Sequence, residues 1–477
     1  MSLLLKKFLP ATRRNFCQAH TDESSLHHLI GWVKQARRMK KNSFLNVSDG
    51  SSPKTLQVVC PSIILPENLA VGSAVKITGT LKSFEQPREV GELQFDHCEL
   101  FANYVEILNP KPETSVINDI HWASNSFSMP DLGLLHSPNG LQWRHQLTPY
   151  QSIFRLRRAV NRIIVSEFDE AGYLEVDTPI LTKIDCEGDC QQFGVFTDNA
   201  KQGSTVKLTG SAQLHLELLV QGLGKVFTMN QTFRAEPSHS RMHLAEFRMV
   251  EAESMQLTDV PALCDEIEAL IKAIFERFLL KCVDQAHGEE LSIDVALVKE
   301  SFCQIDQFNA GHELQNVIDC SFNRVTFNEA LNLLKDEPSR YDRAASGLNR
   351  SDELKLIEIL GGKPTFLTHF PVPLKPFYAE LDPSDHSCTL SVDLLFPGVG
   401  EVVGGSVRAQ SVERLMKGCE ANGTELAQWY ANTRALPSSG PHGGFGIGFD
   451  RLMQFMFGIH NIRDVVPFPR EINKIFL

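Results

Sequence analysis

Hydrophobic and polar positions alternate in the middle of the chain, on both sides of a short polar loop. From Val226 to Phe233, and again from Phe247 to Glu251, the pattern has a period of two. This period is typical of strands, because successive side chains of a strand point to opposite faces. The pattern therefore predicts two antiparallel strands joined by the polar loop.

The end of this hairpin carries residues suited to a nucleotide. Arg234 and Glu236 are two residues apart, which predicts that they share one face of a strand. With His243 in the loop and Phe247 on the second strand, they form a candidate site, because a guanidinium binds phosphate and a ring stacks on a base. The alternative is an ion pair on a half-buried hairpin with a core phenylalanine.

Short apolar stretches separated by glycine and aspartate turns occupy residues 26–108. About five strands of this kind predict a small closed barrel of the oligonucleotide-binding (OB) type. A basic run from Lys34 to Lys41 lies beside Trp32 and Phe44, a combination that a nucleic-acid-binding barrel would show, with charge for phosphate and rings for stacked bases. The alternative is a solvated charged loop with core aromatic residues. Residues 109–150 contain several prolines and little periodicity, so we interpret them as a hinge.

Helical periodicity begins after the hinge. Apolar residues at steps of three and four predict an amphipathic helix over residues 151–172, followed by a strand over 173–180 that ends near Pro179. A second helix is expected over 260–281. Residues 302–374 are mixed, with helices near 327–334 and 352–360, and we assign no chemistry to them.

The last third of the chain contains two further candidate sites. Predicted strands at 390–395 and 401–405 place Asp393 and Glu401 roughly opposite each other, either as a Mg²⁺ site or as a repulsive pair that needs a basic partner. Arg408 is expected at the start of a helix. The glycine-rich stretch 443–451 predicts a strand that passes into a helix with Arg451 in its first turn, which suits a phosphate. Close packing of the glycines is the alternative.

The composition of the chain restricts the class of protein to which it can belong. The chain has 477 residues, a net charge of −12 and 42% hydrophobic residues, which indicates a multidomain globular protein without a generally basic coat. No apolar run is long enough to cross a bilayer, so we expect no membrane insertion. The eleven cysteines lack paired spacing and are expected to be free thiols rather than zinc ligands. Residues 1–21 carry basic but no acidic residues, which favours a mitochondrial presequence over a frayed basic terminus and places the protein in the mitochondrial matrix.

Together these motifs resemble the three motifs of class II aminoacyl-tRNA synthetases. The residues that carry the resemblance are, in order, the helix and strand that end at Pro179, Phe233-Arg-x-Glu236 with His243-x-x-x-Phe247, and Gly444-x-Gly-x-Gly-x-Asp-Arg451. The barrel is similar to the anticodon-binding barrel of the aspartate, asparagine and lysine subgroup. Segments 213–217, 397–408 and 461–470 resemble the asparagine-specific enzymes of mitochondrial or bacterial kind.

The resemblance implies an α+β fold, in which a class II antiparallel sheet with flanking helices follows an N-terminal OB-type β-barrel. The implied divisions are a presequence at 1–21, an anticodon-binding barrel at 26–108, a hinge at 109–150 and a catalytic domain at 151–477 with a mixed insertion at about 260–375. A homodimer through the Pro179 region is also implied. The implied activity is the ATP-dependent attachment of asparagine to tRNA(Asn) through an asparaginyl-adenylate, for mitochondrial translation, with Mg²⁺ as cofactor.

The resemblance implies a role for each residue that matches a family motif. Arg234 and Arg451 are expected to be catalytic and to bind ATP. The other expected ATP-binding residues are Glu236, His243, Phe247, Glu401 and Gly448. Those expected to bind asparagine are Glu187, Ser211, Gln213, Glu217 and Arg408, while Glu401 with Asp393 is expected to hold Mg²⁺ and Phe44 with Gln57 to bind the anticodon.

Selectivity is expected to depend on one charge. Aspartate-specific relatives have a lysine at the position of Leu216, whereas here Glu217 follows it. A glutamate repels aspartate and accepts a hydrogen bond from a carboxamide. The alternatives are an aspartyl-tRNA synthetase, or a non-catalytic synthetase-like subunit that binds nucleic acid. The sequence departs from the family at Glu187-Gly-Asp-Cys190, Ala212, Pro237, Met242 and Asp450.

Overall fold

The computed structural model describes residues 26–83, 94–109, 133–138, 140–184, 192–196, 206–236, 240–284, 288–339 and 341–472. The expected presequence lies outside these residues. The chain forms two compact units. The first holds residues 1–133, 143–152 and 292–297, and the second holds the remaining residues.

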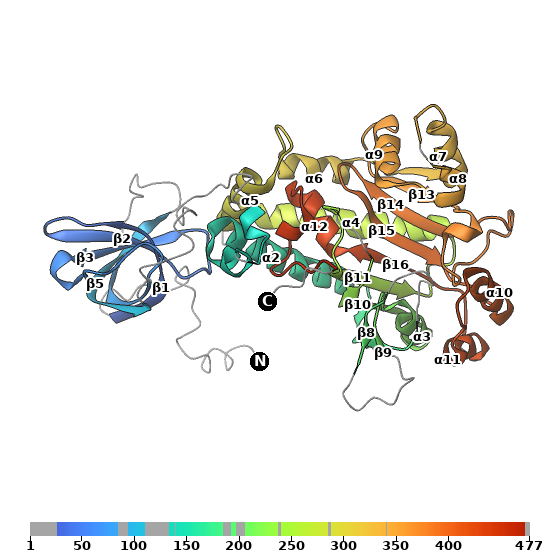
Figure 1. Cartoon of the computed structure of the whole chain (residues 1–477), viewed down its shortest axis with the longest axis horizontal. Coiled ribbons are helices and arrows are strands. Elements are labelled where there is room, and N and C mark those ends of the chain that lie inside the picture. The colour runs from blue at the N-terminus through green and yellow to red at the C-terminus, as the bar shows by residue number, and fades with distance from the viewer. Residues whose placement is uncertain are drawn as a thin grey trace. The chain divides into compact units, whose positions relative to one another are not determined.

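The first unit contains a closed barrel of five strands (Figure 1). Its strands are β1 (Leu26–Arg37), β2 (Asn42–Ser48), β3 (Thr55–Pro61), β4 (Ala74–Ser83) and β5 (Gln94–Asn109), in the order β1-β2-β3-β5-β4. Alternate residues such as Leu29, Leu45 and Ile77 point inward and form one apolar core. The predicted OB-type barrel is confirmed.

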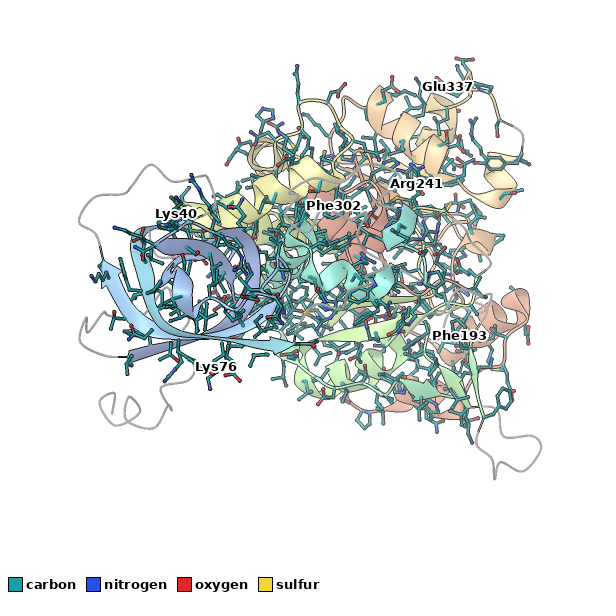
Figure 2. All side chains as sticks on the ribbon, turned by 60° about the vertical axis from the view of Figure 1, so that its left-hand side comes forward. Lys40, Lys76, Phe193, Arg241, Phe302 and Glu337 are labelled. Carbon is teal, nitrogen blue, oxygen red and sulfur yellow. The ribbon has the colours of Figure 1, made fainter. Side chains whose placement is uncertain are left out.

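The outer face of β1–β3 carries the polar and aromatic side chains. Trp32 is 42% exposed, so it is not a core residue. Phe44 and Asn46 are two residues apart on β2, and Asn46 lies opposite Gln57 on β3, which places all three on this face. Lys40 and Lys76 also project from the barrel (Figure 2). The alternative, a charged loop, does not hold for the start of the basic run, because β1 extends to Arg37.

The second unit is built on an eight-stranded sheet in the order β12-β13-β14-β15-β16-β11-β10-β6 (Figure 1). The pairs in the middle are antiparallel, and a parallel pair stands at each edge. The strands are β6 (Leu174–Glu175), β10 (Lys225–Phe233), β11 (Glu246–Ser254), β12 (Asn323–Thr326), β13 (Thr365–Thr368), β14 (Ser391–Phe396), β15 (Gly400–Val407) and β16 (Gly443–Gly448). The strands β7 (Leu181–Thr182), β8 (Gly194–Val195) and β9 (Val206–Leu208) form a second, small sheet in the order β7-β9-β8.

Helices flank the sheet, which confirms the predicted α+β class. Helix α4 (Val260–Val283) begins where the Asp259 side chain accepts a hydrogen bond from the Ala262 amide. Its Phe275 packs on Phe396 of β14 and Phe455 of α12 (Phe449–Phe457), with ring centroids 6.3 and 5.8 Å away. The other helices are α2 (Thr148–Glu170), α3 (Gln213–Leu223), α5 (Gly288–Phe302), α6 (Ala310–Asp319), α7 (Phe327–Leu333), α8 (Arg343–Ser346), α9 (Arg350–Ile359), α10 (Val412–Asn422) and α11 (Gln428–Asn432).

Three local expectations need correction. The strand predicted over 173–180 has only two paired residues, and Pro179 is exposed beyond it. Arg234 and Glu236 follow the end of β10 instead of sharing a strand face. Arg408 directly follows β15, whereas helix α10 begins at Val412. Within the described residues, no helix combines the length and apolarity that a membrane span needs.

Candidate active site

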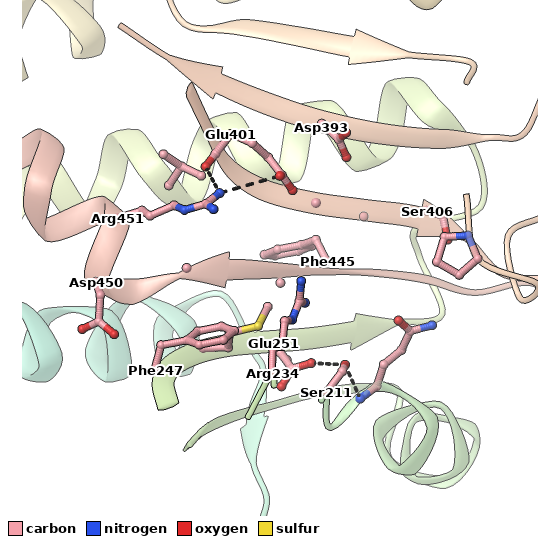
Figure 3. Close-up of a pocket in the computed structure, with 18 of the residues that line it drawn as sticks. Ser211, Arg234, Phe247, Glu251, Asp393, Glu401, Ser406, Phe445, Asp450 and Arg451 are labelled. Carbon is pink, nitrogen blue, oxygen red and sulfur yellow. Dashed lines mark hydrogen bonds and ion pairs between the residues drawn. The ribbon is translucent and has the colours of Figure 1, made fainter. Parts of the chain in front are cut away.

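One cavity of about 480 Å³ lies on the sheet and gathers most of the predicted site residues. Arg234, Glu401 and Arg451 all line it, although they come from the end of β10, from β15 and from α12 (Figure 3). The other predicted residues in its lining are Ser211, Gln213, Glu236, His243, Phe247, Asp393, Arg408 and Gly448. The sheet order explains this convergence, because β10, β11, β16 and β15 are consecutive neighbours.

Arg234 is held at the edge of the cavity by its backbone. Its amide donates to the Ala245 carbonyl at 3.0 Å, which continues the hairpin beyond β10. Its guanidinium carbon lies 5.5 Å from the centroid of the Phe247 ring. A cation and an aromatic ring thus face the same space, as a phosphate and a stacked base require.

His243 lies in the loop of this hairpin and contacts the Ser240 hydroxyl. Burial lowers the pKa of His243, and the positive charge of Arg451 lowers it further. A neutral imidazole is therefore favoured at neutral pH.

Arg451 contacts Glu401 through both the backbone and the side chain. Its Nη1 donates to the Glu401 carbonyl at 2.7 Å and lies 3.7 Å from the Glu401 carboxylate (Figure 3). Gly446 and Gly448 precede it on β16, and both line the cavity. The predicted strand-to-helix passage, with Arg451 in the first turn, is confirmed.

Asp393 and Glu401 converge without being directly opposite. In the register of the hairpin, Asp393 pairs with Gly404, and Glu401 pairs with Leu395. A Cβ atom on Gly404 would lie 3.2 Å from Glu401 Oε1 and 3.5 Å from Asp393 Oδ1, so glycine leaves room for both carboxylates. The basic partner that such a pair needs is also present, because Lys375 Nζ donates to both Asp393 oxygens at 2.6 and 2.7 Å.

These oxygens are the ligand type that Mg²⁺ prefers, in a site where phosphate and water complete the shell. Burial raises the pKa of Asp393 to about 6 despite the opposing charge of Lys375, and the Glu401 charge adds to the increase. The described residues contain no group of three or more His, Cys, Asp or Glu side chains arranged around a metal. The donor set therefore fits an ion shared with a phosphate ligand rather than one held by protein alone.

Glu251 organises the segment before α3, and the sequence analysis did not single it out. The Ser211 hydroxyl donates to Glu251, and the Ala212 amide donates to both of its oxygens at 3.0 Å. Burial raises the pKa of Glu251. This carboxylate fixes Ser211 at the cavity wall beside Arg234 (Figure 3), and the Ser211 hydroxyl accepts from the Gln213 amide at 3.1 Å.

Arg408 lies in the cavity wall with 3% of its surface exposed. Its Nε donates to Glu253 Oε1 at 3.0 Å and its Nη1 to the Ser406 hydroxyl at 2.7 Å. Glu253 Oε2 has no hydrogen-bond partner within the described part of the chain. Burial raises the pKa of Glu253 to about 7, the Arg408 charge opposes the increase, and the Glu217 charge adds to it.

Glu217 is not the lone anion beside this pocket, contrary to expectation, because the carboxylates of Glu251 and Glu253 line the cavity and Glu217 does not. Glu217 is fully buried and lies outside the lining. Burial acts to raise its pKa, but the charge of Arg434 and its other donors hold the pKa well below the usual range. Its donors are Gln213 Nε2 at 2.9 Å, the Tyr430 hydroxyl at 2.7 Å, Arg434 Nη2 at 2.7 Å and His442 Nε2 at 3.4 Å.

Arg434 and His442 were missed because they lie far from Glu217 in the sequence. The available signal was the position of His442, directly before the glycine-rich stretch that begins at Gly443.

The structure gives the contacts of Met242 and Asp450, two positions at which the sequence departs from the family pattern. Met242 is buried, and its sulfur lies 3.7 Å from Gln454 Nε2, whereas the neighbouring Arg241 is exposed and contacts His460. Asp450 is buried and ion-paired with Arg157. Glu187, Cys190 and Pro237 lie outside the described residues.

Known families match both parts of the chain. Residues 141–472 match the family described as tRNA synthetases class II (D, K and N), and residues 28–108 match the OB-fold nucleic acid binding domain. The asparaginyl-tRNA synthetase of Mus musculus is 33% identical over 459 residues, which cover 94% of this chain and 90% of that protein. The asparagine–tRNA ligase of Nostoc sp. is 32% identical over 467 residues, which cover 92% of this chain and 94% of that protein.

Among solved structures, asparaginyl-tRNA synthetase from Pyrococcus horikoshii complexed with asparaginyl-adenylate is similar along nearly its whole length. The TM-score is 0.77 at 25% sequence identity, and the match covers 95% of this chain and 96% of that chain.

Proposed function

The chain belongs to the class II asparaginyl-tRNA synthetases, and from that membership we propose that it joins asparagine to tRNA(Asn) through an asparaginyl-adenylate. The observation that carries the proposal is the placement of Arg234, Glu401 and Arg451 around one cavity. Glu401 lies near the start of β15, and Arg408 directly follows the end of this strand and lines the same cavity. One strand thus connects the residues proposed for phosphate with the residue proposed for the amino-acid side chain.

In the first step, a carboxylate oxygen of asparagine attacks the α-phosphorus of ATP, and the bond from that phosphorus to the leaving pyrophosphate breaks. The protein supplies position and charge rather than a nucleophile. Arg234 faces the α-phosphate, and Arg451 faces the outer phosphates, while the adenine stacks on Phe247. In the second step, the 3′-terminal adenosine of the tRNA takes the asparaginyl group and AMP leaves.

Mg²⁺ is proposed as the cofactor of the first step, with Glu401 and Asp393 as the residues that would hold it. When bound, the ion neutralises charge on the phosphate oxygens. Lys375 stabilises the Asp393 carboxylate, which burial alone would drive toward its protonated form.

Selectivity for asparagine follows from a pocket whose charges are already balanced. Arg408 and Arg434 face Glu253 and Glu217 in one buried network. A neutral carboxamide adds no charge to this network, whereas the second carboxylate of aspartate would be buried without a free counterion. We propose that Arg408 donates to the side-chain carbonyl of asparagine.

Pyrophosphate exchange with ATP, measured with asparagine and with aspartate, tests the function. We expect exchange with asparagine alone. Exchange with aspartate would identify an aspartyl enzyme, and no exchange with any amino acid would favour the non-catalytic alternative.

The role of Arg408 needs a paired variant, because removal of one partner leaves a buried charge and destabilises the fold by about 3–5 kcal/mol. The double change Arg408→Gln with Glu253→Gln removes both charges. We expect it to lose asparagine-dependent exchange while ATP still binds in calorimetry. Arg414→Gln is the control, because Arg414 donates to the Ala379 carbonyl and lies outside the cavity lining. A matching loss of ATP binding would mean that the pocket is wrongly assigned.

We also propose that the protein acts in mitochondrial translation in the matrix, on the basis of the basic residues and the lack of acidic residues in 1–21. The same fluorescent fusion with and without these residues tests this location. Mitochondrial fluorescence that persists without them would contradict a presequence in this segment.

A further inference from the structure

Helix α9 of the insertion contacts the turn that carries Glu401, although no chemistry was expected in this part of the chain. Arg350, at the start of α9, donates from Nε to the Val399 carbonyl at 3.1 Å and from Nη2 to the Gly398 carbonyl at 2.7 Å. One turn further along α9, Glu353 Oε2 accepts a hydrogen bond from the Glu401 amide at 3.1 Å. The first turn of α9 thus forms hydrogen bonds to three successive peptide groups of the β14–β15 turn.

The peptide groups of Glu401 are held from two sides. Glu353 binds its N–H, and Arg451 Nη1 binds its carbonyl at 2.7 Å. The side chain of Glu401 keeps 43% of its surface exposed and lines the cavity. The backbone of this residue is therefore fixed while its carboxylate faces the ligand space.

The first turn of α9 is itself firmly anchored. Asn349 and Asp352 form a capping box at its start. Asp352 is buried and accepts from Arg343 Nε at 2.9 Å and from Arg343 Nη2 at 2.8 Å. A buried, charge-assisted pair of this kind holds the helix end in one position.

Gly400 shows how closely the two segments approach. A Cβ atom at this position would lie 2.5 Å from Glu353 Oε2. Its φ of +90° also belongs to the region that favours glycine. The turn therefore depends on glycine both for its backbone conformation and for the space that Glu353 occupies.

We propose that Glu353 is a positioning residue for Glu401, which it fixes through the backbone amide so that the Glu401 carboxylate meets the metal and the phosphates. This inference rests on the proposed function of Glu401. Glu353 does not line the cavity, and the described residues hold no three-member carboxylate group for a metal. Glu353 therefore acts through the Glu401 peptide rather than as a ligand.

Two substitutions of Glu353 separate these roles. Glu353→Ala removes the acceptor, whereas Glu353→Gln keeps a side-chain oxygen that accepts from the Glu401 amide. Mn²⁺ binding in the presence of ATP, followed by electron paramagnetic resonance, gives a readout that does not depend on turnover. The Mg²⁺ concentration for half-maximal pyrophosphate exchange and the KM for asparagine are measured in parallel.

We expect Glu353→Ala to weaken Mn²⁺ binding and to raise the required Mg²⁺ concentration by roughly tenfold or more, as for other residues that orient a metal ligand. The KM for asparagine should stay unchanged. Glu353→Gln should behave like the natural chain. Glu358→Ala on the same helix is the control, because Glu358 is exposed and pairs only with Lys355 among the contacts described.

Glu401→Ala is the reference for the proposed function. If it leaves Mn²⁺ binding intact, the metal role of Glu401 fails and the positioning role fails with it. If Glu401→Ala loses Mn²⁺ but a folded Glu353→Ala protein does not, only the positioning role is overturned. Equal losses in Glu353→Gln and Glu353→Ala would also overturn it, because they would show that the charge of Glu353 matters rather than its acceptor oxygen.

Discussion

Single residues set the charge of the cavity, and Arg234 has the most direct proposed role. It lines the cavity beside Phe247, with its guanidinium carbon 5.5 Å from the centroid of that ring. Arg234→Met keeps the apolar stem but removes the charge. We expect asparagine-dependent exchange to fall about 100- to 1,000-fold, because one transition-state donor contributes roughly 3–4 kcal/mol.

Arg155→Met on α2 is the control for this change, since Arg155 lies outside the cavity lining. Steady-state exchange and thermal unfolding are measured for both variants. An Arg234→Met protein that exchanges at the natural rate would exclude the phosphate role.

Because the pKa of Glu253 lies near neutrality, we expect the selectivity to depend on pH. Below its pKa of about 7 the carboxyl is neutral, so the Arg408 charge is less balanced and attracts aspartate more strongly. We expect the preference for asparagine over aspartate to rise as pH increases through 7. Exchange with each amino acid between pH 6 and 8 measures the preference, and Glu253→Gln should flatten the profile.

Other charged groups face Glu253, namely Arg408, Glu217 and His442. His442→Gln is the control for the histidine among these neighbours. If this variant flattens the profile while Glu253→Gln leaves it unchanged, the assignment to Glu253 is wrong.

The same carboxyl affects stability in a defined direction. Its pKa in the folded protein, about 7, lies above the ordinary value of 4.5, so the folded state binds the proton more tightly than the unfolded chain. The contribution of Glu253 to the free energy of unfolding therefore falls as pH rises from about 4.5 to 7.

The sequence predicted the residues whose neighbours in the chain reveal their role. Arg234, Phe247 and Arg451 lie in motifs of clear strand or helix periodicity, and each lines the cavity. Glu251 and Glu253 were not chosen, because a polar residue at every second position of a strand usually faces solvent. Only the sheet order shows that this face of β11 is covered and becomes a buried wall.

Among the elements, the turn between β14 and β15 combines a backbone conformation that favours glycine with a close contact. Gly398 and Gly400 both have positive φ, 73° and 90°. A Cβ atom on Gly398 would meet nothing within 4 Å, whereas on Gly400 it would meet Glu353. Gly400→Ala should therefore lower the free energy of unfolding by about 1–3 kcal/mol more than Gly398→Ala, because it also displaces the half-buried Glu353 acceptor from the Glu401 amide.

Chemical denaturation of the two alanine variants measures this difference. Gly398→Ala is the matched control, since it carries the backbone strain without the contact. Equal stability of the two variants would show that Glu353 moves aside without loss.

Element type was predictable wherever periodicity was long. The helix over α2 and the hairpin of β10 and β11 were expected from 3.6- and two-residue patterns, and both are present. The stretch after Tyr173 was misjudged because its apolar residues have no neighbouring strand beyond two residues of pairing with β10. Strand formation needs a partner, which a single segment of sequence does not reveal.

For the whole molecule, the exposed residues around Pro179 support the proposed homodimer. Leu174, Ile180 and Leu181 are 52%, 40% and 57% exposed, and a cluster of exposed apolar side chains favours an interface. Light scattering should give a mass twice that of the 53.4 kDa chain. Leu181→Lys should shift it toward one chain.

Ile63→Lys is the control for this substitution, because Ile63 is 93% exposed on the barrel and far from Pro179 in the sequence. A natural chain that scatters as a single copy at micromolar concentration would contradict the homodimer.

The barrel is expected to act only in the tRNA-dependent step. Phe44→Ala on β2 should raise the KM for tRNA roughly tenfold, because stacking of one base contributes about 1–3 kcal/mol. Exchange, which needs no tRNA, should be unchanged. Leu108→Ala is the control, since Leu108 is an exposed apolar residue on β5. Equal losses in charging and exchange would remove the anticodon role of Phe44.

The closed barrel has one further consequence. Each of its strands finds both neighbours within the barrel, and among the residues that the structure describes its apolar core draws only on positions between 29 and 107. A sheet without free edges needs no other part of the chain to complete its pairing. The module is thus suited to exchange between proteins: a graft of a different barrel would redirect which nucleic acid is chosen and leave amino-acid activation as it was.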